Sequence, residues 1–470
     1  MDKTAHIKRY LPWVVATSLF MEQLDSTIVN TAIPSIAASL HVTPLSLKSV
    51  VASYILSLAV CIPLSGWVAD RFGTRRVFAA AIALFTLSSV LCGLSDNALM
   101  MVAARILQGI SGAMMVPVGR LTIVRTFPKS ELLHAMNFVI LPALLGPLLG
   151  PTIGGLIVHW LSWRDIFFVN VPIGLMALVL IYRYMPNYYG DKRRSLDIPG
   201  LILFSSGAAL LSWVLEIFGE HHVSTPLIVM LLIVSFGFLG GYFFHARRCA
   251  YPLLQLALFR IRTFRVSVVG GFITRLGVGG LPFLMPLLYQ LGLGLPAWHS
   301  GLLMMPTAAA AIGMKFVAEP ILQRFGYRKV LIVNTLMIGI VILSFASVTP
   351  ETPQINIVLR SLALGFFNSL QFSSMNSMAY ADIAQEESSM ASTIFSSLQQ
   401  MSLSFGLACG SFVVAWYLGD MPQSNHVAII GALHHAFIIL GLITGLSSLF
   451  FLTLKSRDGE NVSHAHREKR

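Results

Sequence analysis

Charge is what this chain has least of: only 11% of its 470 residues are charged, while 56% are hydrophobic. A soluble domain carries about 25% charged residues, so this chain cannot cover a water-facing surface and lipid must form most of its surroundings. The net charge of +12 does not indicate nucleic-acid binding, because the basic residues lie in short clusters between apolar stretches and not on one face. Such clusters are typical of cytoplasmic membrane loops.

Cysteine is scarce as well, and several catalytic motifs are missing. The four cysteines lie far apart, without a C-x-x-C pair or a Cys/His metal spacing, so we predict neither a disulfide framework nor a metal site. No H-E-x-x-H or G-x-S-x-G motif is present, which argues against an enzyme. The dipeptide Gly-Lys, which a P-loop requires, does not occur, so ATP-driven transport is disfavoured. We therefore expect no cofactor.

Long apolar stretches, by contrast, fill the chain. The first follows a basic N-terminus, as in a signal peptide, but Glu22 and Asp25 interrupt it and no cleavage-like site precedes them, so we expect a retained span. A helix needs about 20 mostly apolar residues to cross the hydrocarbon core, and helices pair their own backbone groups there. The short alternating segments of a β-barrel are absent. We predict an all-α polytopic membrane protein with fourteen spans, at about 11–33, 48–69, 77–96, 99–121, 134–158, 164–186, 198–218, 226–246, 266–290, 297–318, 329–349, 354–379, 390–417 and 427–454.

The basic residues predict the orientation of these spans, because cytoplasmic loops are enriched in Lys and Arg. Of the 32 Lys and Arg residues, two fall in predicted outer loops, four fall within spans, and the remaining 26 fall in inner loops and tails. A wrong helix count would scramble this asymmetry. We therefore predict a multi-pass protein of the inner (plasma) membrane with both termini in the cytoplasm.

An internal repeat divides the chain. The pattern R-F-G-x-R-[RK]-V occurs at 71–77 and again at 324–330. Arg105 and Arg360 form a second echo, each a few residues into a span that starts outside. Two echoes with nearly one offset indicate duplicated six-helix halves, although basic inner loops can also resemble each other by composition. We predict an N-terminal half, two inserted helices with their loops, a C-terminal half and a cytoplasmic tail, at 1–186, 187–263, 264–455 and 456–470.

Four motifs together resemble the major facilitator superfamily, and specifically its fourteen-span drug:proton antiporter branch (the EmrB/QacA type) with its HsrA/MdtD group. They are the first-span motif Leu24–Pro34, the inner loop Gly66–Arg76, the fourth-span motif Arg105–Gly112 and the fifth-span motif Gly146–Gly155. The resemblance implies a major facilitator fold. It also implies a latch between the halves, formed by Gly66, Asp70, Arg71, Gly73, Arg75 and Arg76. The second-half loop has Gln323 in place of Asp70, so any latch there works differently or is weaker.

Charges within spans are the candidates for mechanism, since each costs about 2.5–3.5 kcal/mol near a helix centre. At 1.5 Å per residue, Asp25 and Arg105 lie at similar depths, so they can meet in the first half. A carboxylate beside a guanidinium ionises readily and becomes a stronger base when its partner leaves, which couples protons to conformation. We expect Asp25→Asn to abolish proton-coupled export and to leave folding intact. The alternative is that these charged residues form a static ion-pair network that fixes helix packing.

Three other charged residues are candidate proton or substrate contacts. Glu22 lies one turn from Asp25, and is a second proton site or a contact for a cationic substrate. Arg275 and Arg360, in the second half, either neutralise acids or anionic substrate groups or form structural pairs.

The fifth-span motif has a mechanical interpretation. Its glycines allow close helix approach and its prolines bend the helix, which favours a hinge or a seal against proton leak over ordinary Gly/Pro enrichment. The residues of this predicted antiporter hinge are Gly146, Pro147, Gly150, Pro151, Gly154 and Gly155.

The predicted function is proton-coupled antiport that exports drug-like or amphipathic small molecules by alternating access, with the proton gradient as energy source. The alternative is an exporter of one physiological metabolite. The expected partners are membrane lipid, a small-molecule substrate and protons. Nucleic acid is not expected, and the sequence gives no indication of an oligomeric state.

Overall fold

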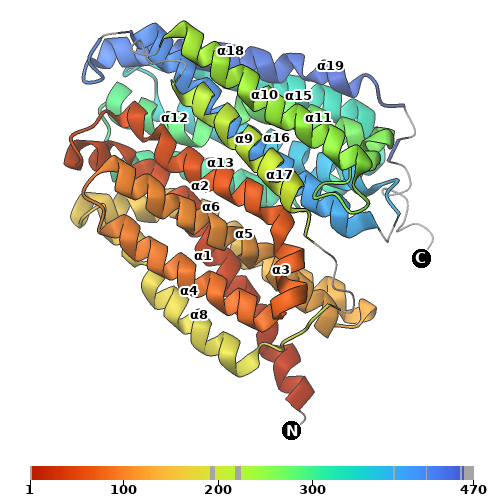
Figure 1. The fold of residues 1–470 in the computed structure, drawn as a ribbon. Helices are drawn as coiled ribbons and strands as arrows, with labels where there is room; N and C mark the ends of the chain where they lie inside the picture. The colour runs from red at the N-terminus through yellow and green to blue at the C-terminus, as the bar shows by residue number, and fades with distance from the viewer. Residues whose placement is uncertain are drawn as a thin grey trace. The chain divides into compact units, whose positions relative to one another are not determined.

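The computed structural model describes residues 3–190, 196–217, 224–384, 387–419, 421–455 and 458–459, and the regular secondary structure of this part of the chain is all helical (Figure 1). It divides into two compact units. The first comprises Met1–Ile198 with Pro296–Leu302, and the second comprises Pro199–Leu295 with Leu303–Arg470. The division into two halves, an insert and a tail that the sequence predicts is not tested by this partition and stays a prediction.

The first unit is a bundle of long helices. Its hydrophobic runs form helices because each helix pairs its own backbone groups. Pro63, which lacks an N–H, lies at the break between α2 and α3. The Asn97 side chain accepts a hydrogen bond from the Met100 backbone N–H at 2.8 Å and so caps α5. The elements are α1 (Lys3–Ser39), η1 (Pro44–Leu47), α2 (Lys48–Cys61), η2 (Ile62–Leu64), α3 (Ser65–Phe72), α4 (Thr74–Gly93), α5 (Ala98–Thr126), α6 (Lys129–Trp160), α7 (Asp165–Phe168) and α8 (Asn170–Tyr184).

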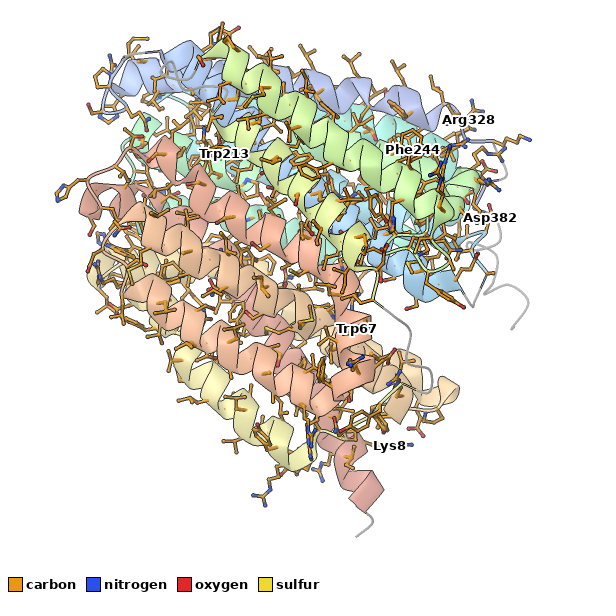
Figure 2. The ribbon with its side chains drawn as sticks, in the orientation of Figure 1. Lys8, Trp67, Trp213, Phe244, Arg328 and Asp382 are labelled. Atoms are coloured by element: carbon orange, nitrogen blue, oxygen red, sulfur yellow. The ribbon has the colours of Figure 1, made fainter. Side chains whose placement is uncertain are left out.

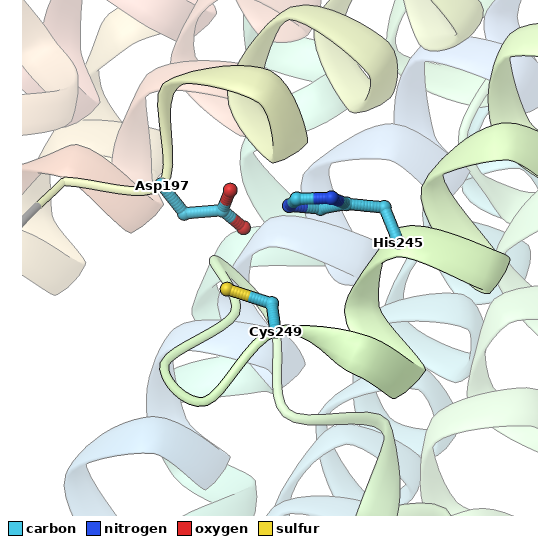
Figure 3. A group of neighbouring side chains, drawn as sticks. All are labelled: Asp197, His245 and Cys249. Atoms are coloured by element: carbon cyan, nitrogen blue, oxygen red, sulfur yellow. The ribbon is translucent and has the colours of Figure 1, made fainter.

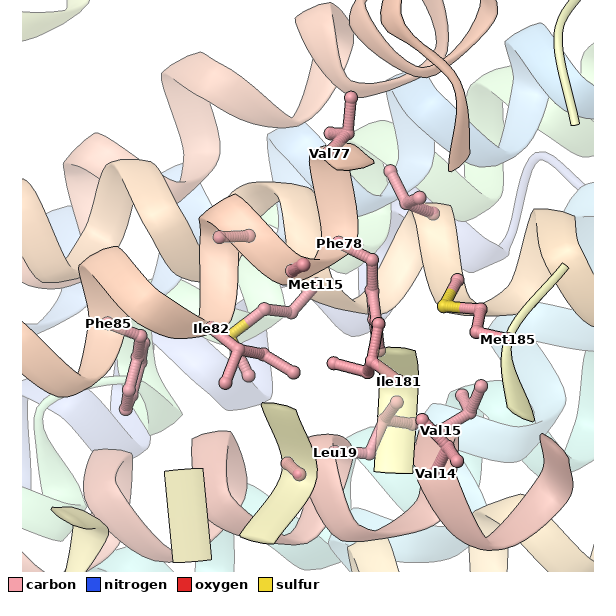
Figure 4. Packing of buried hydrophobic residues seen from close by; sticks show 14 of the residues in the cluster. Val14, Val15, Leu19, Val77, Phe78, Ile82, Phe85, Met115, Ile181 and Met185 are labelled. Carbon is pink, nitrogen blue, oxygen red and sulfur yellow. The ribbon is translucent and has the colours of Figure 1, made fainter. Parts of the chain in front are cut away.

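A buried apolar cluster holds this unit together (Figure 4). Phe78, Ile82 and Phe85, spaced at helical intervals on α4, are fully buried against Val15 of α1 and Met115 of α5. Side chains three and four residues apart lie on one face of a helix. The cluster therefore fixes α1 and α5 through the same face of α4.

The second unit contains the remaining helices. They are α9 (Ile198–Ile217), α10 (Thr225–Arg248), η3 (Leu256–Arg260), α11 (Arg262–Val278), α12 (Leu281–Leu287), the π-helical η4 (Leu288–Gly292), α13 (Ala297–Met314), α14 (Ala318–Phe325), α15 (Tyr327–Ser344), η5 (Phe345–Ser347), α16 (Gln354–Tyr380), α17 (Ser388–Leu418), α18 (His426–Leu446) and α19 (Ser448–Phe451). Large apolar side chains point outward from several of them, among them Trp213 of α9 and Phe244 of α10 (Figure 2). Such an apolar exterior suits lipid.

An ion pair links a residue near the C-terminus to the start of α11. Arg262 donates two hydrogen bonds to the Asp458 carboxylate, at 3.0 and 2.5 Å. Partial burial raises the pKa of Asp458, but the hydrogen bonds and charges of Arg262 and Lys455 lower it more, so this pKa lies below its usual value. The acid therefore stays ionised at neutral pH and holds Asp458 against the start of α11.

The predicted number of spans is met in part. Within the described residues, eleven helical runs are long and apolar enough to cross a membrane, and the bent pair α13 and α14 makes a twelfth if it forms one span. The other two predicted spans correspond to α1 and α6. The polar residues Glu22, Gln23 and Asp25 lower the hydropathy of α1, and Leu144–Trp160 of α6 forms a shorter apolar helix.

Candidate functional site

A fully buried ion pair lies in the middle of the first unit. Arg105 of α5 donates a hydrogen bond from Nη1 to Asp25 Oδ2 of α1 at 2.6 Å. Asp25 and Arg105 expose 0% and 1% of their surfaces. The depths estimated from the sequence predicted this contact, and the structure contains it. The part that the two residues play in transport stays a prediction.

Two amide side chains complete the coordination of the carboxylate. Gln108 Nε2 and Asn170 Nδ2 donate to Asp25 Oδ1 at 2.8 and 2.6 Å, and both also contact Ser89 Oγ, at 2.8 and 3.1 Å. We call these five residues, Asp25, Ser89, Arg105, Gln108 and Asn170, the Asp25 junction. It joins α1, α4, α5 and α8. Sequence analysis did not identify Ser89 and Asn170. The one feature of the sequence that could have identified them is that each is a polar residue within an apolar stretch.

The guanidinium of Arg105 is held from two further sides. Its Nη1 also donates to Gln108 Oε1 at 2.7 Å, and its Cζ lies 4.2 Å from the centroid of the Tyr54 ring, where the π-face attracts a cation. These contacts hold Arg105 in place, but neither brings a second negative charge next to it. Asp25 is therefore the one carboxylate hydrogen-bonded to Arg105 among the described residues.

Glu22 lies in the same helix but outside this hydrogen-bond network. It is 3% exposed, and its Oε2 has no hydrogen-bond partner within the described residues. Leaving a charged oxygen unpaired in an apolar interior is costly. A proton or a cationic group would each remove that cost, so Glu22 remains a candidate for either.

The predicted latch loop is bound to neighbouring segments of the same unit. Asp70 pairs with Arg125 at 2.8 Å, at the end of α5. A strap, defined here as residues 186–190, lies against the loop. The Thr74 N–H donates to Tyr188 O at 2.9 Å, and the Arg75 N–H donates to Asn187 Oδ1 at 3.0 Å.

The other predicted latch residues are placed less tightly. Arg71 lies over the ring of Trp67, with its Cζ 5.4 Å from the centroid. Arg76 is exposed, and a side chain at Gly66 would meet no atom within 4 Å. Whether these residues act as a latch stays a prediction.

Gly73 is the tightest point of this loop, and Gly73→Ala tests it. Its φ of +91° is unfavourable for other residues, and an added Cβ would collide with the Asn187 side chain. We expect Gly73→Ala to lower the free energy of unfolding by about 1–3 kcal/mol and to expose the strap to protease. The measurements are the melting temperature in detergent and limited proteolysis.

Gly326 provides the matched control for Gly73. It occupies the equivalent position of the repeat, with a φ of +75°, and an added Cβ there has no neighbour within 4 Å. Gly326→Ala should show the backbone strain alone. Equal losses of stability in the two variants would mean that the strap contributes nothing.

The predicted hinge glycines form the contact face between α6 and α1. A Cβ at Gly146 would lie 2.6 Å from Gln23 Cβ, and one at Gly154 would lie 2.6 Å from the Ile28 carbonyl oxygen. At Gly150 an added Cβ would collide with Thr27 Oγ1. The three glycines recur every four residues and so share one face. Their backbone contact covers the segment of α1 that carries Asp25.

The adjacent face of α6 packs against the first turn of α13, which belongs to the same unit. A Cβ at Gly155 would collide with the Ala297 carbonyl oxygen, and one at Gly301 would collide with that of Pro151. Thr152 Oγ1 donates to Gly301 O at 3.3 Å. Pro147 and Pro151 lie inside α6, and the hinge role of these residues stays a prediction.

The two predicted arginines of the second unit have different environments. Arg360 donates from Nη1 to the Ser344 carbonyl oxygen at 2.6 Å, so this echo of Arg105 binds a backbone carbonyl and not an acid. Arg275 of α11 is buried between aromatic rings. Both arginines belong to the second unit, whereas the Asp25 junction lies entirely in the first.

The end of α10 carries two side chains of metal-binding type. His245 and Cys249 are four residues apart, with their ligand atoms within 4.8 Å of one another (Figure 3). Sequence analysis overlooked this spacing. Within the second unit these two residues are fewer than the four ligands of a structural zinc site, and the absence of a metal site stays a prediction.

Comparisons with known proteins match the whole length of the chain. A model of the Major Facilitator Superfamily matches residues 15–407 and, in a second match, residues 268–470. The "Putative multidrug resistance protein MdtD" of Salmonella typhimurium is 39% identical over 466 residues, which cover 98% of each protein. Its namesake from Serratia proteamaculans is 39% identical over 439 residues, which cover 93% of this chain and 92% of the relative.

Solved structures share the fold at low sequence identity. A D-xylose-proton symporter aligns with a TM-score of 0.68 and 15% identity, over 96% of this chain and 98% of that chain. An inward-facing bacterial homologue of the human lysosomal transporter Spinster aligns with a TM-score of 0.66 and 13% identity, over 97% of each chain. At these identities the likeness concerns the fold alone.

Proposed function

Because the chain belongs to the Major Facilitator Superfamily, we propose that it is a proton-coupled antiporter that exports drug-like or amphipathic small molecules by alternating access. Family membership makes the chain a multi-pass membrane transporter of a small molecule and not an enzyme. The name that its relatives carry, a multidrug resistance protein, supports the class of cargo. Proton coupling is the finer part of the proposal, and the Asp25 junction carries it.

In the proposed topology, fourteen helices cross the inner membrane and both termini are cytoplasmic. This proposal has two supports. Helices occupy every one of the fourteen predicted segments within the described residues, and the basic residues concentrate on one predicted side. The two helices α9 and α10 are the proposed insert between the six-helix halves.

The proposed proton site is Asp25, because its carboxylate links helices that would have to move. Its Oδ2 accepts a hydrogen bond from Arg105 of α5, and its Oδ1 accepts from Gln108 of α5 and Asn170 of α8. Protonation removes the charge that attracts Arg105 and weakens these bonds. Conversely, a helix movement that breaks them leaves a carboxylate without partners, which then binds a proton more readily. Arg105 keeps its own proton and acts by stabilising the ionised acid.

Other residues have supporting roles in this proposal. Glu22 is a second proton or cation contact, and Arg275 and Arg360 neutralise anionic groups of the substrate. The loop with Asp70, its partner Arg125 and the strap form the latch, while the contact face of α6 is the hinge. No cofactor is needed, since the proton gradient supplies the free energy.

Everted membrane vesicles provide the test of the proposed function. Vesicles energised to an acidic interior and loaded with a pH-sensitive dye should alkalinise when any of several amphipathic compounds is added outside. A response to one compound alone would favour an exporter of a specific metabolite. Export that persists after the proton gradient is collapsed would overturn proton coupling.

A further inference from the structure

Within the part of the chain that the structure describes, Arg275 is a buried cation without an anionic partner. Its side chain belongs to α11 of the second unit and is 9% exposed. Within the described residues, no hydrogen bond or ion pair reaches its guanidinium. Arg105, which is similarly buried, has the Asp25 carboxylate at 2.6 Å. Arg105 thus has an anionic partner, whereas Arg275 has none among the described residues, so its donors are available to an anionic group of another molecule.

The chemistry of arginine requires such a partner. A guanidinium stays charged and carries five N–H donors, and a buried charge is costly unless it is paired and hydrogen-bonded. A carboxylate matches the fork of donors with two parallel hydrogen bonds. An anionic group of a bound molecule would satisfy the donors and neutralise the charge at once.

The surroundings of Arg275 are aromatic. Its Cζ lies 5.6 Å from the ring centroid of Phe372 on α16, and 5.6 Å from that of Phe395 on α17. Ring faces attract a cation but cannot accept five hydrogen bonds. Gly271 leaves room for the head group, since a Cβ there would lie 2.8 Å from Arg275 Nη1. Phe372 keeps 43% of its surface exposed, so one wall of the site is accessible.

We propose that Arg275, Phe372 and Phe395 form a recognition site for cargo that carries a carboxylate on an aromatic ring. The guanidinium binds the carboxylate and the exposed Phe372 ring packs against the aromatic body, while the buried Phe395 ring holds the guanidinium in place. This site deepens the proposed export function, on which it rests, by naming one substrate class: aromatic anions. A small inorganic anion would satisfy the charge but would leave the Phe372 ring without a function.

Binding of a matched pair of probes to the purified full-length protein tests the site. 2-Naphthoate and 2-naphthamide share their rings and differ in charge. We expect 2-naphthoate to bind at least about ten-fold more tightly, as a charge-assisted hydrogen bond implies. Equal affinities of the unaltered protein would overturn the proposal without any variant.

Variants then test whether Arg275 causes the preference for 2-naphthoate over 2-naphthamide. Arg275→Gln should abolish it and Arg275→Lys should retain part of it. Arg265→Gln is the matched control on the same helix, where an exposed arginine contacts the Phe259 carbonyl oxygen at 3.4 Å. An undiminished preference in Arg275→Gln would refute the site.

A further variant and a competitor test the role of the rings. Phe372→Leu should weaken 2-naphthoate binding, whereas displacement by equimolar chloride together with an unchanged affinity of Phe372→Leu would indicate an inorganic-anion site and refute the proposal. The assay needs no proton gradient. A protein that binds 2-naphthoate selectively but moves no protons would refute antiport and leave this site intact.

Discussion

Asp25→Asn is expected to reduce proton-coupled export to background. The asparagine side chain keeps the shape of the aspartate but cannot take up and release a proton in its place, so the step that links protons to helix movement is lost. The measurement is dye-reported proton flux in proteoliposomes with an imposed gradient. Export against a concentration gradient that persists in Asp25→Asn would exclude Asp25 as the coupling acid.

Asp25→Asn is also expected to lower the free energy of unfolding. The sequence alone had suggested that this variant would fold normally. Removing one partner of a buried ion pair costs about 3–5 kcal/mol, because Arg105 is left charged and 1% exposed. The double variant Asp25→Asn/Arg105→Gln removes both charges. It should recover much of the melting temperature without recovering export. If the double variant also transports protons, the pair is a scaffold and nothing more.

Gly150→Ala is expected to lower stability and slow export through the packing of α1. The added methyl group would collide with Thr27 Oγ1 and lie 3.1 Å from Thr27 Cβ, and overpacking of this kind costs about 1–3 kcal/mol. The displacement falls two residues from Asp25. The measurements are melting temperature and transport rate in the same preparation.

Two further variants separate this effect from a general cost of alanine. Thr27→Ala removes the colliding oxygen, so Gly150→Ala/Thr27→Ala should be more stable than Gly150→Ala alone. Gly240→Ala, in α10, adds a methyl group with no atom within 4 Å and should leave stability and transport unchanged. A Gly150→Ala protein with unaltered melting temperature and rate would show that close α1–α6 contact is unnecessary.

The helices were predictable because the length of an apolar run decides whether a segment can be helical in lipid. Breaks within those runs were harder to predict. The sequence predicts one span at 266–290, and the structure has one candidate span there, Arg262–Gly292. Its division into α11, α12 and a π-helical turn was not predicted. Gly279 and Gly280 lie at the first break. Glycine is frequent in membrane helices, so its presence alone does not mark a break.

The site was predictable only where charges are involved. A charge within a span is rare enough to be noticed, and depth along two helices then places Asp25 beside Arg105. Ser89 and Asn170 are neutral, and small polar residues are common at helix contacts in membranes. The environment of Arg360 could not be predicted from the repeat. The repeat suggests a counterpart of Arg105, but residues 278–280, which the offset aligns with Asp25, contain no acid.

The Asp25 junction also has consequences for how the protein is made. Arg105 follows Asp25 by 80 residues and Asn170 follows it by 145. Protein synthesis adds about 5–20 residues per second, so Arg105 is made roughly 4–16 s after Asp25, and Asn170 is made later still. During synthesis α1 therefore carries the Asp25 carboxylate without its hydrogen-bond partners. The insertion machinery or the helices made first must keep this carboxylate out of lipid until α8 has been made.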